Sequence, residues 1–587
     1  MNSISVSGKN WIPKEFNSED INYFKTNFFL DEIVAKLLSI RKIKKEEIDF
    51  FLNPSIKKIL PNPFILKDMD KATERTISGI LKKEKVGIFG DYDVDGATST
   101  AILGQYFKSL NIDYEIYIPD RKNEGFGPNE NAFSEFINLG VNLIFTVDCG
   151  TLSFAPMDFA KNKNIDVIIL DHHQSEIKLP NAHAIVNPNR FDDRSELNFL
   201  CAAGVCFLFL IALNKKLRDQ NWFELNSILE PDLINILDLV SLGTVCDVVP
   251  LVGLNRAIVS QGLKVLKKKQ NLGLKTLIES NNIESSITTY HLGYVLGPRI
   301  NAGGRVGKST HGANLLLNSS PQETFKIASE LNSYNKERQI LESELLNKIL
   351  NVDLDKNSDP VIILYGENWH EGIIGIIAAR VKEKYNKPTI VISVTSGIGK
   401  GSCRSIYGFD IGSVIIGAVQ KELLIKGGGH KMAAGFTIKM SQIEKFKEFV
   451  FKKFKSVNIN LEEKKNYYFD IEIAPSAVNF NFFEKVNLLA PFGSGNNEPR
   501  FTISNLKVLN SKIVGEKHIK SVLLGSDSTT MKTITFNSVE TELGVYLLKK
   551  NKKNLNIAGK LSLNEWRGQK NVEFIIDDIS VIKEQKN

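Results

Sequence analysis

The sequence predicts a mixed α/β protein, in which two α/β domains are joined by a long helix and followed by a small β-barrel. Short, continuous apolar runs separated by helix-length stretches indicate parallel strands that are buried on both faces of a sheet. The amphipathic stretch over residues 322–350 is typical of one long helix. After about residue 460, several short strands with turn signals indicate a β-barrel.

Composition sets the outer limits of this prediction. The 587 residues are enough for three or four domains, at roughly 150 residues each. The net charge of +7 permits a polyanionic partner without requiring one. The five cysteines show no zinc-finger spacing, so we expect reduced thiols in a cytoplasmic protein. The N-terminus lacks a signal pattern and no apolar run approaches ~18 residues, so we expect no membrane span.

Residues 1–80 are predicted to be a helical N-terminal lead-in. The first α/β domain is expected over residues 81–275, with apolar runs at 86–89, 141–147 and 165–170. Ligands of parallel sheets bind at the carboxyl ends of the strands. The polar residues that follow each run are therefore the candidates for a functional site.

Carboxylates and imidazoles follow every one of these runs. The candidates are Asp91, Asp93 and Asp95 after the first run, Asp148 after the second, Asp171, His172 and His173 after the third, and Asp247 after a further apolar segment at 236–240. Each acid taken singly could cap a helix on the surface. The two histidines could likewise be a surface pair or have a partner in the core. Their accumulation at one rim favours a functional cluster.

Mixed oxygen and imidazole donors are typical of a hydrolytic site with two Mn²⁺ or Mg²⁺ ions. Crowded carboxylates either shift their pKa values or bind a cation. Asp148 is placed to bridge two cations about 3.5–4 Å apart. We expect His173 to hydrogen-bond the scissile phosphate and Asp171 to orient a histidine. Asp91 is either a metal ligand or an acid behind the ligands.

The sequence DYDVDG at 91–96, together with Asp171-His172-His173, is similar to the DHH phosphoesterase superfamily. Features further along resemble its bacterial family of single-stranded-DNA-specific exonucleases, over nearly the whole chain. The resemblance implies two Mn²⁺ or Mg²⁺ ions and 5′-to-3′ hydrolysis of single-stranded DNA to 5′-mononucleotides. It also implies a role in recombination and repair, single-strand-binding protein and helicases as partners, and a cytoplasmic monomer.

Cationic residues outside the acidic cluster are candidate phosphate ligands. Arg121 resembles a substrate-phosphate ligand of the family, although a surface salt bridge is an equal alternative. Within an expected helical linker, residues 276–355, the segment 297–305 is expected to be a glycine-rich loop that carries Arg299, Asn301 and Arg305. The alternative is a simple connection between helices. Polar residues of the long helix are expected only to join domains.

A second α/β domain, expected over residues 356–458, resembles the DHH-associated domain. In that domain a glycine-rich GGGH loop faces the metal centre across a cleft. The residues that match a terminal-phosphate pocket are Ser402, Arg404, Gly428, Gly429 and His430.

Residues 459–587 are expected to form an OB-fold that binds nucleic acid. The basic run at 549–553, with Lys549 and Lys550, and the aromatic residues Tyr467 and Trp566 suit sequence-independent binding of a single strand. The alternative is that aromatic residues fill the barrel core and the lysines form a solvated turn.

Two rival functions remain. Other hydrolases of the superfamily act on short oligoribonucleotides, cyclic dinucleotides or pyrophosphate, but the C-terminal barrel favours a polymer substrate. A non-catalytic strand-binding protein would have lost metal ligands, whereas every expected acid and histidine is present.

Overall fold

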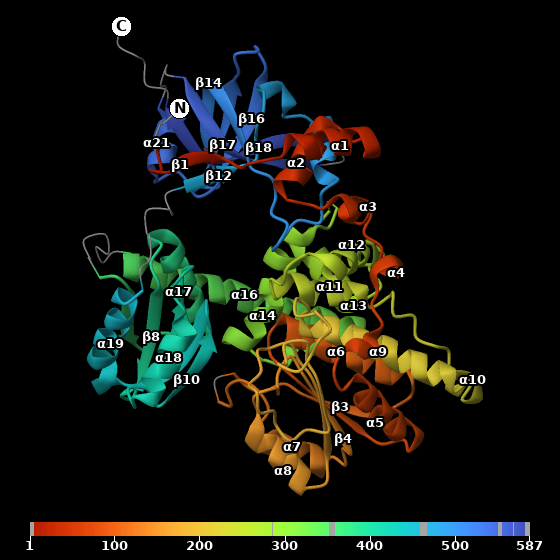
Figure 1. Ribbon diagram of the computed structural model, residues 1–587. Coiled ribbons are helices and arrows are strands. Elements are labelled where there is room, and N and C mark those ends of the chain that lie inside the picture. The colour runs from red at the N-terminus through yellow and green to blue at the C-terminus, as the bar shows by residue number, and fades with distance from the viewer. Residues whose placement is uncertain are drawn as a thin grey trace.

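The computed structural model describes residues 5–121, 123–284, 286–350, 359–457, 466–549, 554–566 and 569–581. Two α/β domains lie side by side, joined by the long helix α16 (Pro321–Leu350), and the C-terminal barrel packs over the helical part of the first domain (Figure 1). The predicted fold class is therefore confirmed. None of the described helices combines the length and apolar character that crossing a membrane requires.

The first domain contains a fully parallel sheet of five strands in the order β3-β2-β4-β5-β6. The strands are β2 (Val86–Gly90), β3 (Tyr114–Tyr117), β4 (Leu143–Val147), β5 (Asp166–Leu170) and β6 (Ala184–Val186). Neighbouring residues face opposite layers, so Ile88 and Phe145 pack with the α6 and α9 side, whereas Phe89 and Ile144 pack with the α7 and α8 side. This double burial explains why the strands read as continuous apolar runs.

The helices of this domain surround the sheet and extend into an all-helical region. They are α5 (Met69–Leu81), α6 (Val94–Ser109), α7 (Glu130–Asn138), α8 (Phe154–Asn162), α9 (Ala202–Asp219), α10 (Trp222–Leu225), α11 (Leu237–Cys246), α12 (Gly253–Leu266), α13 (Leu272–Ser280), α14 (Gly297–Val306) and α15 (His311–Leu317). A π-helical turn, His291–Leu296, leads into α14.

Two segments differ from the sequence prediction. The apolar segment before Asp247 is the buried helix α11 and does not form a strand-like element. Residues 297–305 form the helix α14 and not a glycine-rich loop. A Cβ atom on Gly304 would lie 3.0 Å from the Cβ of Tyr92. The glycines of α14 therefore serve close packing of a helix.

The second α/β domain has a mixed sheet in the order β10-β11-β9-β8-β7. Its elements are β7 (Ile362–Glu367), α17 (Glu371–Tyr385), β8 (Thr389–Thr395), β9 (Ile398–Arg404), α18 (Ile411–Gln420), β10 (Lys426–His430), β11 (Ala433–Lys439) and α19 (Ile443–Lys455). The expected GGGH loop is instead the edge strand β10, which pairs antiparallel with β11.

Five C-terminal strands close into a barrel because β14 pairs with both β15 and β17. The elements are β12 (Asn466–Phe469), β13 (Ile471–Glu472), α20 (Phe480–Asn487), β14 (Phe501–Val514), β15 (His518–Leu524), β16 (Thr530–Thr535), α21 (Glu542–Leu548), β17 (Leu555–Trp566) and β18 (Gln569–Val581). This confirms the predicted OB-fold.

The N-terminal segment belongs structurally to the barrel. Its elements are β1 (Asn10–Pro13), α1 (Ser18–Phe28), α2 (Glu32–Ile40), α3 (Ile48–Leu52) and α4 (Ile56–Ile59). Strand β1 pairs in parallel with β12, and Phe24, Leu37 and Leu38 share one apolar core with barrel residues such as Phe501 (Figure 1). The expectation of a purely helical lead-in was incomplete, because the strand partner lies near the other end of the chain.

Candidate active site

The acidic cluster lies at the switch point of the first sheet. Strands β2 and β4 are neighbours in the sheet. The connection after β2 leads to β3 on one side, and the connection after β4 leads to β5 on the other side. A crevice forms outside the carboxyl ends of such strands. Asp91 follows β2 directly, and Asp93 caps α6 by accepting hydrogen bonds from the backbone N–H of Asp95 (2.9 Å) and Gly96 (3.1 Å).

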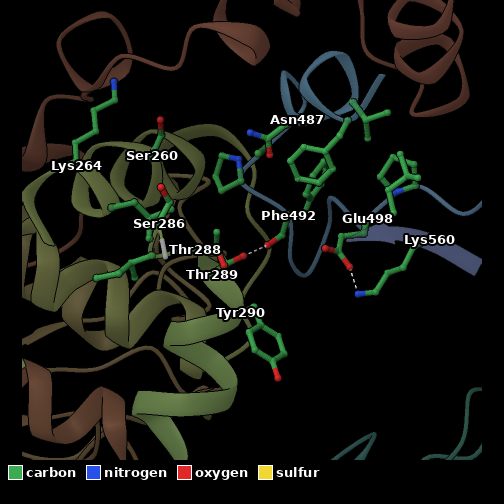
Figure 2. Close-up of a pocket in the computed structure, with 18 of the residues that line it drawn as sticks. Ser260, Lys264, Ser286, Thr288, Thr289, Tyr290, Asn487, Phe492, Glu498 and Lys560 are labelled. Carbon is green, nitrogen blue, oxygen red and sulfur yellow. Dashed lines mark hydrogen bonds and ion pairs between the residues drawn. The ribbon is translucent and has the colours of Figure 1, made fainter. Parts of the chain in front are cut away.

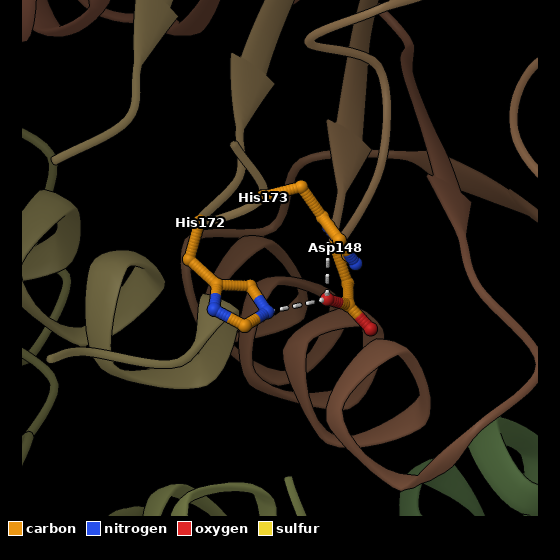
Figure 3. A group of neighbouring side chains, drawn as sticks. All are labelled: Asp148, His172 and His173. Carbon is orange, nitrogen blue, oxygen red and sulfur yellow. Dashed lines mark ion pairs between the residues drawn. The ribbon is translucent and has the colours of Figure 1, made fainter. Parts of the chain in front are cut away.

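Three overlapping groups of donors meet in this crevice. They are Asp91, Asp93 and Asp148; Asp95, His172 and Asp247; and Asp148, His172 and His173, with the donor atoms of each group within 4.8 Å of one another. In Figure 3, dashed lines join the Oδ1 atom of Asp148 to both histidines, at 3.3 Å from Nε2 of His172 and 3.9 Å from Nδ1 of His173. Asp148 and His172 each belong to two of the groups, so these two side chains link the cluster.

The donor set fits divalent cations. Oδ1 of Asp91 and Nε2 of His172 are buried and have no hydrogen-bond partner among the described residues. Burial and the neighbouring Asp93 carboxylate raise the pKa values of Asp91 and Asp148. Burial, with Asp95 and Asp93, raises the pKa of Asp247 to about 9. Unpartnered donors among mutually repelling acids are the chemistry that Mn²⁺ or Mg²⁺ satisfies.

Asp148 also has an uncommon backbone. Its φ angle of 60° lies in the left-handed region, which residues with a side chain rarely adopt. Such conformations persist where the surrounding structure enforces them, often at functional sites. The conformation places the carboxylate over the crevice.

Asp171 forms a hydrogen-bonded ion pair with His173. Its Oδ1 atom lies 2.8 Å from Nδ1 of His173, and its Oδ2 atom accepts the backbone N–H of Thr151. Burial would raise the pKa of Asp171, but His173 and these hydrogen bonds outweigh it and hold that pKa well below its usual value. Burial opposes protonation of His173, yet Asp171 prevails and raises its pKa to about 9. The Asp171 carboxylate therefore favours the protonated form of His173.

Two asparagines that sequence reasoning missed support the histidine loop. Nδ2 of Asn187 donates to the backbone oxygen of His173 (2.9 Å) and to Oγ1 of Thr151 (2.8 Å). Nδ2 of Asn189 donates to the backbone oxygen of His172. Both follow β6, so a short apolar run ending in Asn-Pro-Asn was the available signal.

Asp95 and Asp247 complete the cluster, and each lies at the end of a helix. Both oxygens of Asp95 accept backbone N–H groups at the start of α9, from Ala202 (2.6 Å) and Ala203 (3.0 Å). Asp247 follows the last turn of α11, and its Oδ2 atom lies 3.6 Å from Nε2 of His172. Asp95 is thus fixed in place by the backbone, while Asp247 stays partly accessible.

A group of guanidinium side chains lies beside the acids. Arg305 is half-buried at the junction of the domains, where it donates to the backbone oxygen of Gly372 (3.2 Å). Burial lowers its pKa to about 10, and the nearby Arg121, Arg338 and Arg404 contribute to that lowering. The guanidinium of Arg121 lies 5.3 Å from the ring centre of Tyr92. So many cations in one place suit an anionic group of a substrate.

Residues of the second domain face the same crevice. Arg404 donates to Oγ of Ser402 (3.3 Å) on β9. Burial lowers the pKa of His430, and so do His173 and Arg404, which places the end of β10 near His173. A Cβ on Gly428 would meet no atom within 4 Å, and Gly429 has a φ angle of 153°. This strand therefore presents bare backbone towards the crevice.

Arg299 lies near Arg338 at the edge of the guanidinium group, since burial and Arg338 both lower its pKa. It donates to Oδ1 of Asn332 (2.7 Å) and to the backbone oxygen of Val295 (2.6 Å), which ties α14 to α16. Asn301 lies half-buried one turn before Arg305. These two hydrogen bonds hold Arg299 in place, and its contact with a phosphate stays a prediction.

The barrel candidates fall into three groups. The hydroxyl of Tyr467 donates to Asp577 (2.9 Å) and its ring lies beside Trp11 of β1, so this half-buried residue packs against the N-terminal strand, and its contact with a nucleic acid stays a prediction. Lys549 is exposed at the end of α21. Lys550 and the side chain of Trp566 lie outside the described part of the structure.

A cavity of about 390 Å³ lies away from the acids, between the catalytic domain and the barrel. Figure 2 shows Ser260, Thr288 and Thr289 on one side, with Phe492 and Lys560 on the other. Oγ1 of Thr289 donates to the backbone oxygen of Phe492 (2.6 Å) and so bridges the two domains. The cavity marks an interface between domains, not the chemical centre.

The fold and the acid–histidine cluster at its switch point define a DHH phosphoesterase. Residues 85–244 match the DHH family N-terminal domain, residues 358–456 the DHHA1 domain, and residues 469–578 the RecJ OB domain. The chain belongs to the RecJ family, whose curated members are named single-stranded-DNA-specific exonucleases.

Relatives match along most of the chain. RecJ of Escherichia coli K12 is 33% identical, with 94% of this chain and 96% of that protein covered. RecJ of Bacillus subtilis is 31% identical over 89% of this chain, which spans 64% of that longer relative. The crystal structure of Thermus thermophilus RecJ with Mn²⁺ has a TM-score of 0.79 at 25% identity, and covers 97% of this chain and 78% of that one. The same protein has also been solved with Mg²⁺.

Proposed function

We propose that the protein is a metal-dependent exonuclease that degrades single-stranded DNA from the 5′ end and releases 5′-mononucleotides, with a role in recombination and repair. The observation that carries this proposal is the complete acid–histidine cluster around Asp148, set beside a group of guanidinium side chains. Family membership supports the substrate, because the relatives are named for single-stranded DNA.

Asp91, Asp93, Asp95, Asp148, His172 and Asp247 would hold two Mn²⁺ or Mg²⁺ ions. When bound, such ions polarise phosphoryl oxygens as Lewis acids and lower the pKa of a water molecule to near neutrality. Asp148, shared between two donor groups, would serve both positions. Asp95 is prealigned by its two backbone hydrogen bonds, which limits reorganisation on binding.

His173 has the chemistry of an electrostatic stabiliser. Its imidazolium is held by Asp171 at Nδ1, which leaves the other ring nitrogen available to donate a hydrogen bond to a phosphate oxygen. Such a preorganised donor stabilises charge that develops during phosphodiester hydrolysis. His173 therefore acts on the scissile phosphate, and Asp171 positions it.

The cationic side chains support recognition of a strand end. Arg121, Arg305 and Arg404 lie near one another beside the acids, with Ser402 next to Arg404. A terminal phosphate carries more negative charge than a phosphodiester and would bind where several guanidinium groups converge. Occupation of this pocket by a 5′-phosphate would leave the next phosphate at the acidic cluster, which accounts for mononucleotide release.

Further aspects rest on the family resemblance. We place the enzyme in the cytoplasm as a monomer, in company with single-strand-binding protein and repair helicases. The free state of Cys149, Cys201, Cys206, Cys246 and Cys403 supports a reducing compartment.

The test is hydrolysis of an oligonucleotide labelled at either end while Mn²⁺ or Mg²⁺ is titrated. A 5′ label should appear at once as a mononucleotide, whereas a 3′ label should remain in a ladder of shortening fragments. Asp148→Ala should abolish release by at least ~10³-fold while single-strand binding persists, because the cluster loses a shared donor. Release from the 3′ end, or activity of the Asp148→Ala variant, would contradict the proposal.

A further inference from the structure

An exposed aromatic ring stands beside the catalytic histidine without a role in the mechanism above. Phe126 is 58% exposed, and its ring centre lies 5.7 Å from that of His173 at an interplanar angle of 69°. An isolated exposed apolar residue needs no explanation. An exposed ring in edge contact with the histidine of a hydrolytic centre is different, because any substrate that reaches His173 meets it.

The loop that carries Phe126 is braced. The Glu124 carboxylate accepts hydrogen bonds from the hydroxyl of Tyr117 (2.7 Å), the backbone N–H of Asp120 (2.6 Å) and Nδ2 of Asn129 (3.0 Å). These bonds join the end of β3 to the start of α7. The ring is therefore presented from a fixed frame and loses little freedom when a ligand covers it.

Two glycines fix the direction of the ring. Gly125 and Gly127 flank Phe126 with φ angles of 92° and 83°, in the region that residues with a side chain avoid. A Cβ on Gly125 would meet no atom within 4 Å, so steric room does not explain that glycine. The two left-handed residues turn the backbone on both sides of Phe126, which keeps its ring out of the core.

The same loop begins with a phosphate-binding candidate. Arg121 precedes Phe126 by five residues. It lies close enough to Arg305 and Arg404 to lower the pKa of each. One braced segment thus offers a cation for the terminal phosphate and an aromatic ring next to the histidine of the scissile phosphate. The nucleoside between those two phosphates belongs to the nucleotide that leaves.

We propose that Phe126 stacks on the base of the terminal nucleotide and so positions that nucleotide for release. This inference rests on the proposed exonuclease function and deepens it. Every base has an apolar face, so a phenylalanine here serves strands of any sequence. Phe126 is a positioning residue that contacts the substrate without taking part in bond making.

The test compares two 5′-phosphorylated oligonucleotides, one with a normal terminal nucleotide and one with an abasic terminal nucleotide. Wild-type protein should release the abasic unit with kcat/KM roughly tenfold lower, because the stacking contact is absent. Phe126→Ala should lose roughly tenfold on the normal substrate, mainly through KM, and lose nothing more on the abasic one. Phe126→Trp should restore discrimination.

Phe325→Ala is the matched control, because Phe325 is similarly exposed (64%) on α16. It should behave as wild type. Thermal melting and Mn²⁺ binding by Phe126→Ala should match wild type, which excludes a folding or metal defect. Equal losses on both substrates by Phe126→Ala, or no loss on either, would overturn the inference. Wild-type protein that releases nothing from the normal substrate would instead refute the exonuclease function itself.

Discussion

His173 and Asp171 show how neighbouring residues acquire different protonation states. Asp171 is buried whereas the His173 side chain is partly exposed, and burial alone would favour the neutral form of each. Their mutual attraction reverses both preferences and yields an ion pair with Nδ1 of the histidine at 2.8 Å. The charge of His173 therefore depends on Asp171. Loss of the Asp171 carboxylate should change the protonation of His173 more than metal binding by the cluster.

Asp171→Asn should slow nucleotide release by roughly 10²-fold, because a neutral amide no longer favours the imidazolium that stabilises the phosphate. Mn²⁺ affinity, measured by calorimetry, should change much less than in Asp148→Ala. Asp166→Asn is the matched control, since Asp166 lies at the opposite end of β5, where it binds Arg75. A control as slow as Asp171→Asn would show that the effect is merely structural.

Asp238 is a buried acid that stands outside the catalytic cluster. Burial raises its pKa to about 6, and the only hydrogen bonds that oppose this come from backbone N–H groups. The folded state thus holds its proton more tightly than the unfolded state, whose carboxyl has its ordinary pKa near ~3.9. The folded state becomes less stable as the pH rises from about 4 through about 6.

Asp238→Asn should therefore match wild type near pH 4 and be more stable above pH 7, by up to about 3 kcal/mol. Thermal unfolding midpoints at a series of pH values measure the difference. Asp232→Asn, at an exposed acid shortly before α11, should show no such trend. A constant difference between Asp238→Asn and wild type at all pH values would contradict the assignment.

Sequence patterns revealed individual donors better than their supports. Asp93, Asp148 and His172 stood out because they follow buried strands, where a parallel sheet collects ligands. Asn187 and Asn189 were missed because β6 has only three residues and gives a weak apolar signal. The orientation of Arg299 depends on Asn332 of a distant helix, which spacing along the chain does not reveal.

At the scale of elements, the two errors have different physical causes. Glycine marks both flexible loops and places where helices come close, and only the packing partner distinguishes the two. In α14 the partner of Gly304 is Tyr92, far along the chain. Helix α11 was likewise hard to recognise because it is buried all round and has no polar face to give a helical period.

The contact between α12 and the barrel depends on one buried cation. Arg256 on α12 donates to the backbone oxygens of Phe51 (2.9 Å), Leu489 (2.9 Å), Ala490 (2.8 Å) and Pro491 (3.3 Å). Its guanidinium lies 3.9 Å from the ring centre of Phe51. One side chain thus joins the N-terminal segment, the catalytic domain and the turn that enters the barrel.

Arg256→Met should destabilise the protein by about 3 kcal/mol or more, because several buried carbonyl groups lose their donors together. The thermal midpoint should fall, and proteolysis before β14 should accelerate. Lys264→Met removes the same charge from an exposed position on the same helix and should leave both measurements unchanged. Unaltered proteolysis in Arg256→Met would show that the barrel is held by other contacts.

At the scale of the whole molecule, the sequence revealed the order of domains but not which segments share a core. Phe24, Leu37 and Leu38 carry a helical apolar pattern, and that pattern does not reveal that their partners are barrel residues. A prediction from local periodicity assigns such helices to the nearest domain. In the structure, these N-terminal helices pack against the C-terminal barrel.

A chain of residues 1–457 should therefore expose the apolar faces of α1 and α2, bind a hydrophobic dye and aggregate. A chain of residues 55–457, which lacks those helices as well, should stay monodisperse and keep Mn²⁺ affinity. Light scattering and dye fluorescence separate the two. Equal behaviour of the two chains would show that the N-terminal segment finds cover elsewhere.

The pairing of β1 with β12 also has a consequence for folding during synthesis. Strand β1 and helices α1 and α2 are synthesised long before β18, which completes the core that they share with the barrel. Domains fold as they emerge, so the crevice with the acid–histidine cluster forms before the barrel. An unfinished chain thus exposes β1, α1 and α2 to proteases, and completion of β18 covers these elements.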